Sequence, residues 1–353
     1  MTRTARLSAH TDIATSLALL SDHELAQLVA EGTPAGTGIG GPTKVIEVNG
    51  ARVFVKQVRL TDTELLAENV RSTANVFDVP AFCHYGIGSP GLGAWRELAV
   101  HTMTTNWVVA GRFAGFPLMH HWRILPQPSQ PLPDELADVE RAVAYWGGGP
   151  QVRERIEGLR TASSCLALFL EHIPHTLHDW LGTQLATGDA QAACTLVEQR
   201  LEATTAFLRT HQLLHFDTHF HNILTDGGQL YLADYGLALS DRFPLTRQER
   251  DFFARHRDYD RAHTTWYLVI WLVTELYGYR GQERTDFVRA CADGARPGGG
   301  IPEAAAGVIA RRARGAVVMD EFRHRLEHES RLAPYPHEAL RDALQGVGMP
   351  ASR

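Results

Sequence analysis

Three oxygen-bearing side chains near the middle of the sequence have types and a spacing that suit phosphoryl transfer. Asp217 and Asn222 lie on one polar stretch, and Asp234 follows a predicted strand, turn and strand over 222–233. This hairpin is expected to bring the three side chains to one place. Mg²⁺ prefers oxygen ligands and keeps several waters, so one carboxylate and one amide oxygen suffice when phosphates supply the rest. We therefore predict that Asn222 and Asp234 hold Mg²⁺ and that Asp217 accepts the proton of an attacking hydroxyl.

A purely structural interpretation of the same three residues is the alternative. Asp and Asn are common in turns because their side chains bond to nearby backbone groups. Turn formation does not require this order and spacing, however, so the catalytic interpretation is favoured.

The same stretch resembles a known family. His215-Phe216-Asp217 through Asn222 resembles the catalytic loop of the protein-kinase superfamily, and Asp234-Tyr235-Gly236 resembles its magnesium-binding motif. His219, two positions after Asp217, makes the loop similar to the aminoglycoside phosphotransferase branch, where a His is usual at this position. Its role is either to organise the loop or to act as a chemical group. The resemblance implies an α+β, bilobal fold with a small β-rich N-terminal lobe and a mostly helical C-terminal lobe. It also implies that ATP, or GTP, binds with Mg²⁺ in the cleft between the lobes.

Two features distinguish the sequence from regulated protein kinases. Phe216 stands where such kinases carry an Arg that pairs with a phosphorylated activation segment, and residues 237–257 lack Ala-Pro-Glu. We expect that phosphorylation of that segment does not switch the protein on.

A glycine-rich stretch and a lysine are expected to hold the nucleotide phosphates. The glycine-rich stretch 36–41 is followed by a β-rich run, the turn Asn49-Gly50 and a second β-rich run over 51–58 that contains Lys56. Asn-Gly between two such runs is a strong hairpin signal, whereas a dinucleotide-binding fold would continue into a helix. The kinase resemblance implies that three glycines cover the nucleotide and that Lys56 contacts its α and β phosphates. The glycines are Gly36, Gly38 and Gly41. A flexible loop and a solvated lysine are the alternatives.

The kinase resemblance also requires a helical carboxylate that pairs with Lys56. Glu97 is preferred because its predicted helix leads into the next expected strand over 116–125, although it comes far after the lysine. Glu64 and Glu68, on the run 63–70, are nearer in sequence and remain alternatives. An exposed helical Glu with no such role is possible for each of them.

The buried run Ser164 to Pro174 is predicted as the strand that enters the hinge between the lobes. By position in the resemblance, backbone groups of Glu171, His172 and Ile173 would meet the adenine. Asp260, ahead of an apolar helix, either braces the catalytic loop or caps that helix. Further helices are expected over 21–31, 134–144, 177–185, 190–211, 264–276 and parts of 281–345.

Length and composition limit the class of protein. A chain of 353 residues exceeds the usual single core, and we expect a helical extension over 1–31, an N-terminal lobe with inserted segments over 32–173 and a helical lobe over 174–353. The net charge of −6 argues against nucleic acid as a partner. Four scattered cysteines favour reduced thiols. We expect no signal peptide and no membrane anchor, and hence a cytoplasmic protein.

These observations predict a kinase that moves the γ-phosphoryl group of ATP to a hydroxyl of a small molecule, such as an antibiotic, a sugar or a nucleoside. The first alternative is a Ser/Thr kinase whose acceptor is a peptide or a protein. The second is a pseudokinase that binds nucleotide without turnover. The presence of Lys56, Asp217, Asn222 and Asp234 argues against the last.

Overall fold

The computed structural model describes residues 2–38, 41–86, 88–187 and 189–345 of an α+β protein. The chain forms two compact units. The first unit contains Met1–Ile173 together with Ala233–Thr246, and the second contains Pro174–Leu232 together with Arg247–Arg353. In contrast to the domain limits expected from the sequence, the segment that carries Asp234 thus belongs to the first unit.

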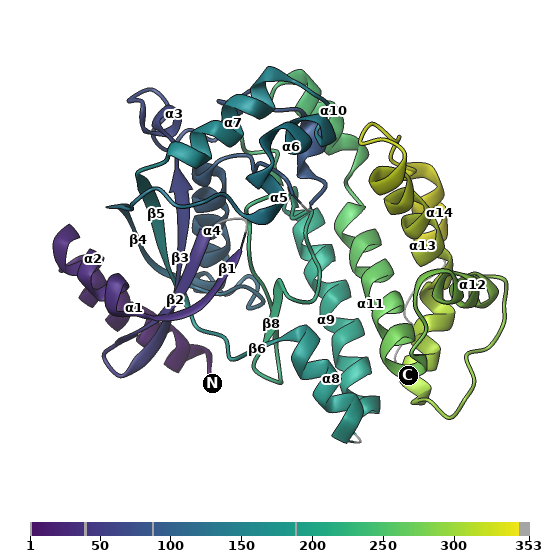
Figure 1. Ribbon diagram of the computed structural model, residues 1–353. Coiled ribbons are helices and arrows are strands. Elements are labelled where there is room, and N and C mark those ends of the chain that lie inside the picture. Colours follow the sequence, from purple (N-terminus) through teal and green to yellow (C-terminus); the bar gives the residue numbers. More distant parts are fainter. Residues whose placement is uncertain (1, 39–40, 87, 188, 346–353) are drawn as a thin grey trace. The chain divides into compact units, whose positions relative to one another are not determined.

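The first unit is built on a five-stranded antiparallel sheet in the order β1-β2-β3-β5-β4 (Figure 1). Its strands are β1 (Thr33–Gly38), β2 (Gly41–Val48), β3 (Ala51–Leu60), β4 (Met119–Pro126) and β5 (Ser164–Glu171). The hairpin from β2 to β3 turns at Asn49 and Gly50, both with positive φ (51° and 75°), as a two-residue type I′ turn requires. The expected hairpin is therefore confirmed.

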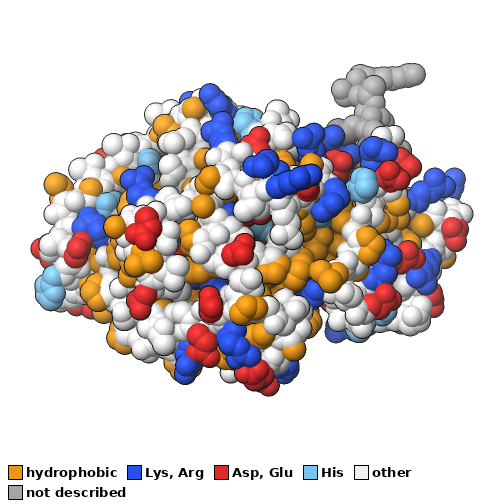
Figure 2. Space-filling view, turned by 90° about the horizontal axis from the view of Figure 1, so that it is seen from above, with side chains coloured by type: hydrophobic (Ala, Val, Ile, Leu, Met, Phe, Trp, Pro, Cys, Tyr) orange, Lys and Arg blue, Asp and Glu red, His pale blue; other side chains and the backbone are white. Residues whose placement is uncertain are grey.

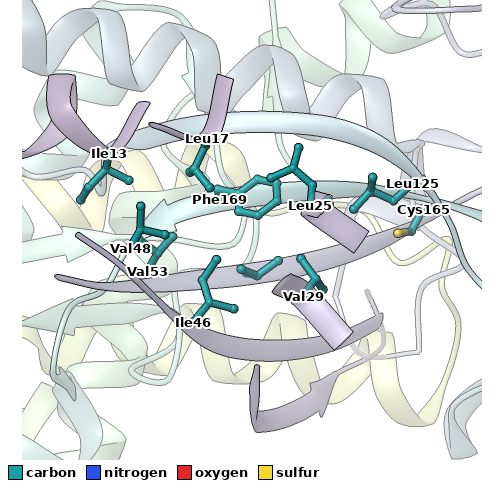
Figure 3. Close-up of a cluster of buried hydrophobic side chains, with 12 residues drawn as sticks. Ile13, Leu17, Leu25, Val29, Ile46, Val48, Val53, Leu125, Cys165 and Phe169 are labelled. Carbon is teal, nitrogen blue, oxygen red and sulfur yellow. The ribbon is translucent and has the colours of Figure 1, made fainter. Parts of the chain in front are cut away.

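Two N-terminal helices cover one face of this sheet. These helices are α1 (Arg3–Ala18) and α2 (Asp22–Glu31). Ile13, Leu17, Leu25 and Val29 pack into a buried cluster with side chains of the sheet such as Phe169, as Figure 3 shows. The helical extension expected over 1–31 is confirmed as these two helices, and a capping box of Ser21 and Glu24 starts α2. Both helices are an integral part of the first unit.

The opposite face of the sheet packs against α4 (Ala94–Val109). Strand side chains alternate between faces, and those of β3 and β5 follow this rule. Val53 and Val55 face α1 and α2, while Val58 and Leu60 belong to the cluster that includes α4. Lys56 has the same parity as Val58, so it faces α4.

Four further helices of the first unit lie in the inserted segments. They are the short α3 (Asp62–Leu65) and α5 (Asp134–Ala137), followed by α6 (Val139–Tyr145) and α7 (Pro150–Thr161), and η1 (Ala81–His84) is a single 3₁₀ turn. The helical run expected over 134–144 is present as two helices, because the chain breaks at Asp138, which caps α6 by accepting the N–H of Arg141 (3.0 Å). The strand expected from residue 116 begins only at Met119. The unit also contains β10 (Leu239–Ser240).

The second unit is mostly helical. Its helices are α8 (Leu177–Thr187), α9 (Ala190–Thr210), α10 (Arg247–Arg255), α11 (Tyr259–Tyr277), α12 (Gly281–Ala292), α13 (Glu303–His328) and α14 (His337–Gln345). Its short strands are β6 (His175–Thr176), β7 (Leu213–Leu214), β8 (Ile223–Thr225) and β9 (Leu230–Leu232), of which β6, β8 and β9 form an antiparallel sheet. The predicted hairpin of β8 and β9 is confirmed, as are the helices expected over 177–185, 190–211 and 264–276.

The distribution of charge, the state of the cysteines and the character of the helices agree with the composition. Acidic and basic side chains lie close to one another over the face that Figure 2 displays. The four cysteines are free and buried. Within the described parts of the chain, none of the helices combines the length and the apolar character that crossing a bilayer requires.

Candidate functional site

In the first unit, Lys56 is held between two carboxylates. Its Nζ lies 2.8 Å from Oε1 of Glu97 and 2.7 Å from Oδ1 of Asp234, and the lysine is only 7% exposed. Burial by itself lowers the pKa of Lys56, but Asp234 and Glu97 outweigh it and hold this pKa above its ordinary value. Lys56 is therefore a buried cation, and the solvated-lysine alternative is wrong.

Glu97 is the helical partner of Lys56. It lies in the first turn of α4, and its side chain is 3% exposed. Burial raises the pKa of Glu97, but the charge of Lys56 lowers it to a net value below the ordinary one. Of the two nearer alternatives, Glu68 is exposed and Glu64 is bound elsewhere in the same unit.

Asp234 reaches Lys56 from a backbone conformation that few residues adopt. Its φ is 62°, in the left-handed region that Asp tolerates better than most side chains. The next residue, Tyr235, is fully buried and contacts His101 edge to face at 4.6 Å between ring centroids. Because His101 lies one turn after Glu97, α4 contacts both Lys56 and the residue beside Asp234. His101 was not predicted, although its spacing of four from Glu97 puts both on one helix face.

In the second unit, the loop after β7 presents Asp217. The N–H of Asp217 donates to Nδ1 of buried His215 (3.2 Å), while Nδ2 of Asn222 donates to the backbone oxygen and to Oδ2 of Asp217, both at 3.0 Å. Nε2 of His219 is 3.6 Å from the same carboxylate, and its backbone oxygen accepts from the N–H of Asn222 (2.9 Å). Asp217, Asn222 and His219 are therefore brought together.

Asp260 braces this loop from α11. Its two carboxylate oxygens accept the N–H groups of His215 (2.7 Å) and Phe216 (2.9 Å), and it is 3% exposed. The N-cap of α11 is Asp258, so the capping alternative for Asp260 is wrong. Phe216 has a φ of 67°, a left-handed conformation that these two hydrogen bonds stabilise.

The pH dependence of stability should report on Asp260. Burial raises the pKa of Asp260 to about 6, from 3.8 for the free side chain. Because the folded protein holds the proton of Asp260 more tightly than the unfolded chain does, this group stabilises the fold fully at a pH below its pKa in the unfolded chain. The stabilisation is lost as the pH rises through its pKa in the folded protein. A difference of about two pKa units corresponds to a loss of about 3 kcal/mol in the free energy of unfolding. Urea titrations of the wild type and Asp260→Asn from about pH 4 to about pH 7 measure it, since their difference cancels other titrating groups. A difference that is constant over this range would contradict the expectation.

The residues predicted to contact the nucleotide base lie at the end of β5, where one is already engaged. The N–H of Glu171 donates to the oxygen of Leu118 (2.8 Å), and its carboxylate accepts from Arg6 of α1 (2.7 and 2.6 Å). The N–H of Glu171 is thus used within the unit. Contact of the backbone at 171–173 with adenine stays a prediction. His172 and Ile173 follow the strand, and both are half-buried.

The predicted phosphate-binding glycines lie on a hairpin. Gly36 and Gly38 are on β1, Gly41 begins β2, and Gly38 pairs with Gly41. Gly41 has a φ of 124°, and a Cβ on it would lie 2.1 Å from the oxygen of Gln57, so no other residue fits. Ile39 and Gly40, within the predicted glycine-rich stretch, lie outside the described residues.

The residues predicted to hold Mg²⁺ have suitable chemistry. Because Nδ2 of Asn222 donates twice to Asp217, the oxygen of the same amide is the atom suited to a cation. The Asp234 side chain is 45% exposed while its Oδ1 contacts Lys56. Among the described residues, no three His, Cys, Asp or Glu side chains are grouped to hold a metal. Mg²⁺ that arrives with a nucleotide needs only one or two protein ligands.

Neither the models of known protein families nor the curated proteins match this sequence.

Proposed function

We propose that the protein is an ATP- and Mg²⁺-dependent phosphotransferase with a kinase-like bilobal fold, which moves the γ-phosphoryl group to a hydroxyl of a small molecule. The contact of buried Lys56 with Glu97 and Asp234 is the observation that carries this proposal. Buried ion pairs add little stability, because apolar residues of the same size are often as stable. A buried cation with two carboxylates is therefore better explained by chemistry than by folding.

The proposal gives each residue one part of a single reaction. Asp217 accepts the proton of the acceptor hydroxyl as its oxygen bonds to the γ phosphorus, and the bond from that phosphorus to the β–γ bridging oxygen breaks, releasing ADP. Lys56 binds the α and β phosphates, with Glu97 holding its ammonium in place. Asp234 and Asn222 are the residues that would hold Mg²⁺, which neutralises phosphate charge when bound. His219 contributes to the loop that orients Asp217.

The same proposal includes contacts with the phosphates and with the adenine base of the nucleotide. Gly36, Gly38 and Gly41 cover the phosphates, and backbone groups of Glu171, His172 and Ile173 contact the adenine. A cytoplasmic location, where ATP is available and thiols stay reduced, goes with it.

The surroundings of Phe216 support an enzyme that needs no activating phosphorylation. Its ring is 1% exposed and packs against Phe252, His256 and Tyr259 at 5.5, 5.8 and 4.8 Å between centroids. An apolar ring in this cluster cannot pair with a phosphate. We expect the transfer rate to be the same before and after phosphatase treatment of the purified protein. A large drop in rate after treatment would contradict this.

The test of the proposal is a search for the acceptor. The full chain is incubated with Mg²⁺ and ATP or GTP against hydroxyl-bearing antibiotics, sugars, nucleosides and a generic protein, and products are weighed by mass spectrometry. The proposal requires a small molecule that gains one phosphate with the wild type and not with Asp217→Asn. Phosphate found only on protein would establish the protein-kinase alternative. Nucleotide binding without any transfer would favour the pseudokinase.

A further inference from the structure

The inserted segments of the first unit form a hydrophobic core of their own. Its buried members come from 79–92, from the helices α5, α6 and α7, and from Trp146 at the C-terminal end of α6. They are Val79, Cys83, Leu92, Leu136, Ala142, Val143, Trp146, Val152 and Ile156. A core of this size exceeds what a connection between β3 and β5 requires. The contacts that these segments make with Lys56, Glu97 and Asp234, which together form the Lys56 group, indicate what the insertion does.

The first contact with that group goes through Glu64, which is fully buried. Its Oε1 accepts the N–H of Ala94, the first residue of α4, at 2.7 Å. The N-cap of α4 is Gly93, which has no side chain to cap the helix. Glu64 therefore supplies the missing acceptor and a negative charge at the positive end of α4. Glu97, one turn into α4, is thereby held against Lys56.

Glu64 is itself held by Arg155 of α7. Nη1 of Arg155 donates to Oε2 of Glu64 at 3.0 Å, Nε donates to the oxygen of Pro90 at 3.2 Å, and the guanidinium lies 4.1 Å from the ring centre of Phe77. The Arg155 side chain is 4% exposed. The same Oε2 also accepts the N–H and the hydroxyl of Thr61 at 3.0 and 2.9 Å. These contacts fix the carboxylate in one orientation.

The second contact reaches the segment that carries Asp234. Leu237, three residues later, packs against the inserted core. Nδ1 of buried His84 donates to the backbone oxygen of Leu237 at 2.7 Å. Burial and the nearby Arg96 lower the pKa of His84 to about 3, so this imidazole is neutral and keeps the contact at ordinary pH. The inserted segments thus contact the elements of both partners of Lys56.

We propose that Arg155 is a positioning residue that acts through Glu64 and the start of α4 to hold Glu97 on Lys56. The inserted segments 61–93 and 134–161 are then an internal brace that keeps the lysine and its two carboxylates assembled without a partner protein or a modification. The kinetic consequence rests on the proposed function, whereas the effect on Lys56 does not.

The composition of the chain offers a direct test, because Lys44 and Lys56 are the two lysines in the sequence. The full-length protein is treated briefly with an acylating amine reagent, and labelling of Lys56 relative to half-exposed Lys44 is read by peptide mass spectrometry. Because both lysines belong to the same chain, the labelling of Lys44 serves as the internal reference for the labelling of Lys56. Arg155→Met is expected to raise it about tenfold, the size of effect that loss of one charged hydrogen bond gives. Arg155→Lys, which retains a donor for Glu64, should stay near the wild type.

The matched control is Arg153→Met on the same helix, since Arg153 makes an exposed pair with Glu140. Circular dichroism and the urea midpoint establish that each variant is folded. If Arg155→Met does not fold, Glu64→Gln, which preserves side-chain size, replaces it with the same expectation. A ratio that is unchanged in the folded variant, or raised equally by Arg153→Met, would overturn the proposal.

Kinetics then separate the brace from the proposed function. Once an acceptor is known, Arg155→Met should lower kcat about tenfold and leave the KM of the acceptor unchanged, because only the Lys56 group is disturbed. A wild type that transfers no phosphate would refute the proposed function and leave the labelling result standing. A variant with normal labelling and normal kcat would refute the brace alone.

Discussion

Replacing Asp217 by Asn should lower kcat by about 10²–10⁴-fold, which is what a general base contributes. An amide is nearly the same size as the carboxylate and can still direct an oxygen at Nδ2 of Asn222, now 3.0 Å away. It cannot accept a proton from a hydroxyl. The loop and the binding of nucleotide should therefore persist, so that kcat falls while the Kd of the nucleotide is nearly unchanged. Steady-state kinetics with the identified acceptor and titration calorimetry with ATP measure the two quantities.

A matched control for this variant is Asp226→Asn in the same unit. Asp226 lies in the turn between β8 and β9 and accepts from the N–H groups of Gly228 and Gln229. An amide oxygen can continue to accept these bonds, so kcat should stay within a few-fold of the wild type. Near-normal turnover of Asp217→Asn would show that Asp217 is not the base.

Replacing Asp234 by Asn should reduce kcat/KM for the Mg²⁺–nucleotide complex by about 10³-fold or more, because preorganised charge at the phosphates is usually the largest catalytic contribution. The change removes one proposed ligand of the cation and one of the two carboxylates that contact Lys56. Unlike Asp217→Asn, it should act on binding. The dependence of nucleotide affinity on Mg²⁺ concentration, measured by calorimetry, is expected to be lost.

Nucleotide affinity in the presence of EDTA serves as the internal reference for this variant, since in the proposed function it reports on Lys56 and the base contacts without the cation. Asp241→Asn is the matched control, because Asp241 is an exposed carboxylate on the same segment of the first unit. An affinity of Asp234→Asn that still rises with Mg²⁺ as in the wild type would remove Asp234 from the metal site.

The features that the sequence predicted correctly depend on neighbours in the chain. The hairpin at Asn49-Gly50 follows from two residues that tolerate positive φ, and α2 follows from a capping box of Ser21 and Glu24. β5 is a short continuous apolar run, buried from Cys165 to Leu170, and a run of this length is typical of a buried strand. In each case the interactions that decide the structure lie within a few residues, so the pattern is visible without the fold.

The features that were missed depend on partners far away in the sequence. Nothing local distinguishes Arg6 from other arginines of a polar helix, yet it binds Glu171 across 165 positions. Glu64 was a candidate partner for Lys56, but its carboxylate instead accepts hydrogen bonds from Arg155 and from the first N–H of α4. The helix α7 was not expected because its apolar residues are few and its register is set by the inserted core. The roles of Asp217, Asn222 and Asp234 in catalysis remain predictions.

The division of the first unit into two stretches of chain has a consequence for biosynthesis. Residues 174–232 separate its sheet from Ala233–Thr246, and Lys56 and Asp234 are 178 positions apart. A ribosome adds about 5–20 residues per second, so roughly 3–12 s pass between residue 173 and Asp234. During that interval the nascent sheet and α4 can fold and pair Lys56 with Glu97, but the second carboxylate does not yet exist. The charge balance around Lys56 is thus completed late, after a long loop has closed.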